Sequence, residues 1–153
     1  MTKKNKALDK IGWREWVSLP ELNIDSIKAK VDTGARTSAL HVSNIKIFKR
    51  TNKVNFTIHP VQRHWHPVVN ATAIMVGKRS IKSSNGESTI RPVIETILKI
   101  GKKLYSIEVT LVNRDLMGFR LLLGRSAIKN RYLVDSGKSF LLEEKLNIEK
   151  GTK

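Results

Sequence analysis

Lys28-Ala-Lys-Val-Asp-Thr-Gly-Ala-Arg36 is the stretch that decides the fold of this chain. Apolar and polar residues alternate loosely from Ile24 to Val31, which is the pattern of a half-buried β-strand. Asp32-Thr33-Gly34 then ends the strand, because glycine permits a sharp turn and a close approach of the backbone to a ligand. The stretch therefore predicts a strand that carries one carboxylate into a tight loop.

The setting of Asp32 is unusual. Between Ile27 and Gly86 it is the only carboxylate, while the same segment holds 11 Lys and Arg residues. Hydrolysis of a peptide by aspartates uses two carboxyl groups that share one proton, one activating water and the other donating to the carbonyl oxygen. The residues after Asp32 suit this task, since Thr33 offers a hydroxyl to brace the loop and Ala35 leaves space for a partner loop. We therefore predict that Asp32, Thr33 and Gly34 form a catalytic loop.

A second local string, Asp135-Ser136-Gly137, resembles the first. We interpret it as an ordinary turn between two short strands, because Asp, Ser and Gly are typical turn residues and no small residue follows in the position of Ala35. One chain would then supply one catalytic aspartate. A two-fold axis can place the same loop against itself. The sequence therefore predicts a homodimer in which each chain contributes one Asp32.

Short strand-like segments dominate the rest of the chain. They cover residues 17–19, 24–31, 39–47, 54–58, 68–76, 90–100, 104–112, 119–124, 132–134 and 140–142. Asn85-Gly86 is a strong hairpin-turn signal, and residues 125–129 are expected to make one or two helical turns. Many short strands with one short helix predict an all-β, closed barrel. Residues 1–10 are expected to be a flexible basic tail, residues 11–142 the domain, and residues 143–153 a charged tail.

The net charge of +16 is the strongest signal in the composition. Such a field attracts polyanions such as nucleic acid, an acidic membrane surface or an acidic peptide, although a solvated basic surface is the alternative. The chain has no cysteine, no signal-like N-terminus and no run of 18 apolar residues. We therefore expect a cytoplasmic protein that does not span a membrane.

Other chemistries lack a signature. His59, His64 and His66 lie close in sequence, but no His-Glu-x-x-His segment and no neighbouring carboxylate accompany them, so we predict no metal site. No phosphate-binding loop and no Gly-x-Ser-x-Gly string is present, so no cofactor is expected. Nucleic acid remains open as a nonspecific partner, because the charge suits it but the aromatic residues form no stacking platform.

Several blocks together resemble the retropepsin-like family often labelled "ATP-dependent zinc protease". They are Ile11-Gly-Trp-Arg-Glu-Trp-Val17, Ile27-Lys-Ala-Lys-Val-Asp-Thr-Gly-Ala-Arg-Thr-Ser-Ala-Leu-His41, Ser83-Ser-Asn-Gly86, Asn113-Arg-Asp115, Met117-Gly-Phe-Arg120 and Leu122-Leu-Gly-Arg125. Members are associated with ATP-grasp glutamate ligases that add glutamate tails to a ribosomal protein. The resemblance implies a retropepsin-like half-barrel that dimerises, with Asp32 catalytic, and an aspartic endopeptidase that acts on polyglutamate-type tails.

A polyglutamate tail is itself a polyanion, so the charge of the chain and the resemblance agree. We predict that cations near the loop and on the Asn85-Gly86 hairpin bind substrate carboxylates, with the hairpin as a candidate lid. The predicted substrate-binding residues are Arg36, Arg79, Lys82, Ser83, Ser84, Asn85, Gly86 and Arg91. The predicted structural supports are Ala35, Gly124 and Arg125, with Arg125 bonded to carbonyl groups or paired with Asp115. Two alternatives stay open: a non-catalytic module that binds acidic tails, and a basic RNA-binding protein.

Overall fold

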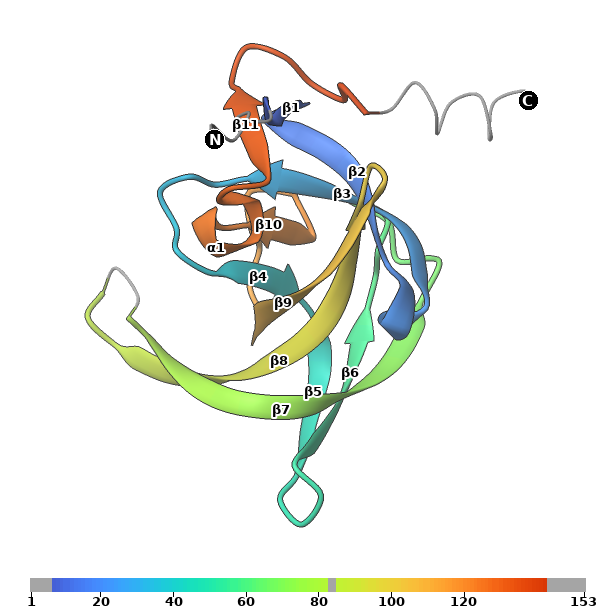
Figure 1. Cartoon of the computed structure of the whole chain (residues 1–153). Helices are drawn as coiled ribbons and strands as arrows, with labels where there is room; N and C mark the ends of the chain where they lie inside the picture. The colour runs from blue at the N-terminus through green and yellow to red at the C-terminus, as the bar shows by residue number, and fades with distance from the viewer. Residues whose placement is uncertain (1–6, 83–84, 143–153) are drawn as a thin grey trace, which may run out of the picture.

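The fold is described from a computed structural model, which covers residues 7–82 and 85–142 (Figure 1). The strands are β1 (Asp9–Gly12), β2 (Arg14–Leu19), β3 (Ile24–Val31), β4 (Ser38–His41), β5 (Ser43–Phe48), β6 (Lys53–Ile58), β7 (Val69–Lys82), β8 (Ser88–Ile100), β9 (Lys103–Val112), β10 (Leu121–Leu123) and β11 (Tyr132–Asp135). A 3-10 turn η1 (Pro20–Leu22) and a short helix α1 (Arg125–Ile128) complete the described part.

The main sheet closes into a barrel. Its strands follow the order β2-β3-β10-β4-β9-β8-β7-β6-β5, and an additional pairing of β2 with β8 joins the first six into a ring. The pairing of Ser18 with Lys99 makes this closure. Inward-facing residues such as Ile27, Ala29 and Val109 are fully buried in the core. The predicted all-β closed barrel with one short helix is therefore confirmed.

The position of β10 sets up the site. It pairs in parallel with β3, Leu123 beside Val31, and antiparallel with β4 on its other side. Parallel neighbours end at the same edge of a sheet, so Asp32 and Gly124, which follow the two strands, emerge side by side. Figure 1 shows the loop after β3, helix α1 and the β7–β8 hairpin on the same side of the barrel.

Three expectations need correction. The chain becomes regular at Asp9, where β1 pairs in parallel with β11, so the last two residues of the expected basic tail belong to a strand. Residues 140–142 are not a strand but a turn-containing segment. The strand expected to stop near Gly77 continues to Lys82, with a bulge between Met75 and Gly77. The charged tail expected over residues 143–153 lies outside the described residues.

A buried carboxylate holds the two ends of the domain together. Glu15 is 0% exposed. Its Oε2 accepts hydrogen bonds from the backbone N–H of Gly12 at 2.6 Å and of Leu141 at 2.7 Å, and its Oε1 accepts one from Leu142 at 3.1 Å. These three N–H groups replace the water that a carboxylate loses on burial. Sequence reasoning missed this role, because the partners of Glu15 are spread across the chain.

No helix in the described ranges is long and apolar enough to cross a membrane.

Candidate active site

The loop that carries Asp32 is fixed by backbone hydrogen bonds to β10 and α1. Asp32 N donates to Leu123 O at 2.8 Å, Arg125 N donates to Ala35 O at 2.8 Å, and Ser126 N donates to Arg36 O at 2.9 Å. The two segments therefore stay in contact along the whole turn. A loop bonded in this way holds its carboxylate in one place, as catalysis by position requires.

Gly124 makes this close approach possible. A Cβ at this position would lie 2.5 Å from the carbonyl oxygen of Thr37, so a larger residue does not fit without backbone movement. The Gly124 N–H donates to Ser38 Oγ at 3.1 Å, and Ser38 is buried. Gly124 thus supports the loop as predicted. Sequence reasoning missed Ser38, although it lies in the same block as Asp32.

Two further bonds shape the loop from within. Gly34 N donates to Asp32 Oδ1 at 3.0 Å, and a Cβ on Gly34 would lie 3.3 Å from the same oxygen. Arg125 Nη1 donates to Thr33 O at 3.0 Å, which confirms the predicted bond from Arg125 to a carbonyl. The alternative partner, Asp115, instead accepts from Gly118 N at 3.0 Å. The loop is thus braced through the backbone carbonyl of Thr33. The sequence had led us to expect bracing by the Thr33 side-chain hydroxyl.

Asp32 is half-buried and faces an open cavity of about 530 Å³. Thr33, Arg125 and Ile128 also line this cavity, and Leu133 and Val134 contribute its apolar wall. Asp32 is the one carboxylate among the lining residues of the described chain. A carboxylate here can accept a proton from water, but a proton-sharing pair needs a second carboxyl from elsewhere.

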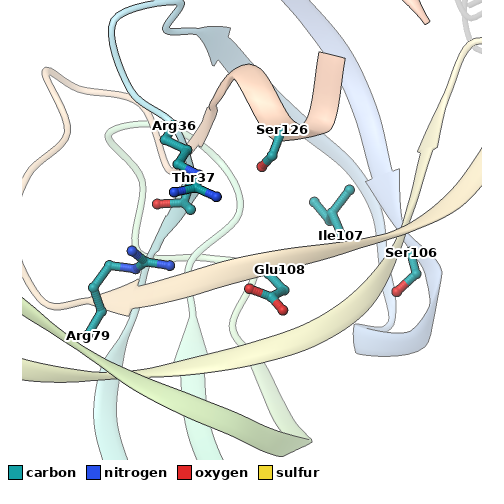
Figure 2. Close-up of a pocket in the computed structure, with 7 residues that line it drawn as sticks. All are labelled: Arg36, Thr37, Arg79, Ser106, Ile107, Glu108 and Ser126. Carbon is teal, nitrogen blue, oxygen red and sulfur yellow. The ribbon is translucent and has the colours of Figure 1, made fainter. Parts of the chain in front are cut away.

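A second cavity, of about 350 Å³, lies between the loop and the β7–β8 hairpin (Figure 2). Arg36 and Arg79, two of the predicted substrate-binding residues, both line it, together with Ser126 and Glu108. Figure 2 shows the two guanidinium groups turned toward the same space, with the Glu108 carboxylate across from them. The fold therefore joins two cations that are 43 positions apart in sequence, and adds a carboxylate that sequence reasoning missed.

The other predicted cations lie on the same hairpin. Arg91 is the direct cross-strand partner of Arg79, so both side chains share one face. Lys82 pairs with Ser88 in the same regular ladder. It lies three residues after Arg79, and because side chains alternate along a strand, it points to the opposite face. Arg91 thus extends the basic surface beside Arg79, whereas Lys82 does not join it.

The tip of the hairpin is described only in part. Asn85 Oδ1 accepts a hydrogen bond from Glu87 N at 3.1 Å, and Gly86 has φ +89°. The predicted turn is therefore at the expected place, but the connection spans residues 83–87 and exceeds a two-residue turn. Ser83 and Ser84 lie outside the described residues.

The second Asp-Ser-Gly string is the turn that the sequence predicts. Gly137 N donates to Asp135 Oδ1 at 3.1 Å, and Lys138 N donates to Asp135 O at 3.1 Å. No strand equivalent to β10 crosses behind this turn in the part of the chain that the structure describes.

Comparisons with known proteins agree with this architecture. A family model described as the RimB-like retropepsin-like aspartic endopeptidase matches residues 10–145. A crystal structure of the protein Lpg0085 from Legionella pneumophila, whose function is described as unknown, superposes with a TM-score of 0.73 at 31% identity and covers 89% of this chain and 99% of that one.

Curated relatives are longer proteins. A "probable alpha-L-glutamate ligase" from Shewanella pealeana is 46% identical over 141 residues, which are 91% of this chain and 31% of that protein. One from Desulfotalea psychrophila is 47% identical over 136 residues, which are 88% of this chain and 29% of that protein. The chain thus spans less than a third of the length of these relatives. On the family match and the geometry together, the chain belongs to the RimB-like family of retropepsin-like aspartic endopeptidases.

Proposed function

We propose that the chain cleaves peptide bonds in acidic, polyglutamate-type tails, using two Asp32 carboxylates, one from each protomer of a homodimer. The observation that carries this proposal is the Asp32 loop. It is fixed by backbone bonds to β10 and α1, and it faces a cavity to which the described chain contributes no other carboxylate. A second copy related by a two-fold axis supplies the missing group from the same loop.

The reaction follows from the chemistry of two carboxyl groups that share one proton. The ionised carboxylate takes a proton from water as the water oxygen attacks the peptide carbonyl carbon. The protonated carboxyl donates its proton to the carbonyl oxygen, which gives a neutral tetrahedral intermediate. Proton transfer to the amide nitrogen then lets the C–N bond break, and the shared proton returns to the pair. No further reactant is needed.

Three observations support an acidic substrate. Arg36 and Arg79 line a cavity beside the Asp32 loop, and neither side chain makes a hydrogen bond or ion pair within the described residues. A dimer would carry 2 × 16 = 32 net positive charges, which would steer a polyanion toward it. The curated relatives are named glutamate ligases, and a peptidase unit within such a protein would meet glutamate-rich products.

We place the activity in the cytoplasm, in keeping with a chain that has no cysteine.

The direct test is incubation of the purified protein with a polyglutamate peptide and a polyglutamine peptide of equal length. Mass spectrometry should show shortening of the first peptide only. An intact polyglutamate peptide that nevertheless binds in a salt-sensitive manner would instead identify a binding module for acidic tails. Binding of RNA that persists at high salt, with no competition from polyglutamate, would favour the RNA-binding alternative.

Removing either cavity arginine is expected to weaken substrate binding more than turnover. Arg36→Gln and Arg79→Gln should each raise KM for polyglutamate about tenfold, because each removes a charge-assisted hydrogen bond to a carboxylate. Steady-state kinetics measure this effect. Lys102→Gln is the matched control, since Lys102 is an exposed cation in the turn between β8 and β9. An equal loss in the control would assign the effect to the overall charge of the protein and not to the cavity.

A further inference from the structure

A second basic cavity lies at the other end of the barrel strands from Asp32. β4 runs from Ser38, behind the catalytic loop, to His41, and β10 begins after Arg120 and ends before Gly124. His41 and Arg120 are thus separated from the catalytic loop by the length of these strands, roughly 10 Å. The cavity measures about 360 Å³, and no carboxylate is among its described lining residues.

Arg120 has a fixed positive charge without a negative partner there. Its Nη1 lies 2.9 Å from His41 Nδ1. A guanidinium only donates, so Nδ1 is the acceptor and His41 is neutral in this contact. Arg120 Nε is buried and has no hydrogen-bond partner in the described chain. Arg120 is thus a half-buried cation whose side chain bonds to the neutral ring of His41. It lacks the anion that normally accompanies such a group.

Histidine and arginine side chains surround Arg120 in this cavity. His59 Nδ1 donates to Trp65 O at 2.7 Å, because a carbonyl only accepts. Burial, and then Arg120, lowers the pKa of His41, with a further lowering by His59 and an opposing effect of Asp115. Arg63, a second cation, and His64 also line the cavity. A bound anion would favour the protonated form of His41.

We propose that this cavity is a binding site for a small oxyanion, a carboxylate or a phosphate group, held by Arg120 with Arg63 and the neighbouring histidines. Both groups present oxygens that an arginine fork and an imidazolium recognise. The proposal does not depend on cleavage of acidic tails, because the cavity is separate from the Asp32 loop.

The test is titration of the protein with glutarate and, separately, inorganic phosphate, at ionic strength held constant with sodium chloride. NMR signals of the His41 and His59 rings should shift saturably with at least one of the two anions, and the anion that saturates identifies the source. Chloride alone should not saturate them. Shifts that follow ionic strength only, with no saturation by either anion, would overturn the proposal.

Variants localise the effect. Arg120→Gln is expected to raise the dissociation constant at least about tenfold. Arg63→Gln, at an exposed position that is less able to disturb the fold, should raise it several-fold as well. Arg50→Gln, in the turn after β5, is the matched control and should leave the dissociation constant unchanged. An unchanged dissociation constant in both cavity variants would overturn the proposal.

The pH dependence has a defined sign. Because protonated His41 favours an anion, and because burial and then Arg120 lower its pKa, the affinity for glutarate should rise about threefold or more between about pH 7.5 and about pH 6. Glutarate keeps most of its charge over this range, so the change reports on the protein. A dissociation constant that increased on acidification would contradict the site.

Discussion

Replacing Asp32 with Asn is expected to lower the rate of polyglutamate cleavage roughly a thousandfold or more, because an amide neither takes a proton from water nor holds the shared proton. The fold should survive, since the amide oxygen of Asn can still accept the bond that Gly34 N donates to Asp32 Oδ1 at 3.0 Å. Steady-state kinetics and thermal melting measured on the same preparation separate the two effects. Cleavage at the wild-type rate by Asp32→Asn would exclude the proposed chemistry.

The same variant tests whether the carboxylate pair forms between two chains. An equal mixture of wild-type and Asp32→Asn chains that exchange freely would contain heterodimers with only one carboxylate. If both carboxylates are needed, activity should fall to about one quarter of that of the same amount of wild-type protein. If each chain worked alone, about one half would remain. The dependence on composition therefore distinguishes a shared pair from an independent site without a structure of the dimer.

The Asp32 loop and the ordinary turn at Asp135 have the same local hydrogen-bond pattern. In both, the N–H two residues on donates to the aspartate Oδ1, at 3.0 Å for Gly34 and 3.1 Å for Gly137. The difference is tertiary, because β10 and α1 bond to the first loop along its length. In the sequence, this difference was indicated by the residue after the glycine, which is the small Ala35 in the first string and Lys138 in the second.

The substrate-binding prediction was limited by strand geometry. Arg36 and Arg79 meet in one cavity, as expected of cations near the loop and on the hairpin. Lys82 is on the same hairpin but faces away from Arg79. β7 also contains a bulge between Met75 and Gly77, and a bulge changes which residues share a face. The bulge precedes both cations, so simple alternation already places Arg79 and Lys82 on opposite faces. The sequence alone could not show which of these two faces meets Arg36.

Local sequence patterns could not predict the role of Glu15, for a different reason. It lies in a strand that reads as ordinary alternation, and two of its three backbone partners are at Leu141 and Leu142. A contact between residues this far apart in sequence follows from the closure of the whole domain. Its consequence is that the segment expected to be a strand over residues 140–142 is fixed by a carboxylate instead of a sheet.

Replacing Glu15 with Ala is expected to lower the free energy of unfolding by about 3 kcal/mol or more, because it leaves one buried and two partly buried N–H groups without an acceptor. Chemical denaturation measures this change. The stability of Glu15→Gln should lie between those of the wild type and Glu15→Ala. The amide oxygen of Gln can still accept from Gly12 and Leu141, while the amide N–H₂ faces the N–H of Leu142. Glu21→Ala, at an exposed position in η1, is the matched control and should be nearly neutral.

The effect of replacing Glu15 should reach the Asp32 loop through the backbone. Glu15 fixes the turn before β2, and within that turn Trp13 O accepts a hydrogen bond from Val31 N at 2.8 Å. Val31 is the residue immediately before Asp32, so loosening this turn removes support from the strand that positions the Asp32 carboxylate. Glu15→Gln is therefore expected to lose activity at a lower temperature than wild type. If the activity of this variant and its folded fraction decreased over the same temperature range, Glu15 would act through stability. Activity lost well below the melting transition would instead show that the turn positions Asp32.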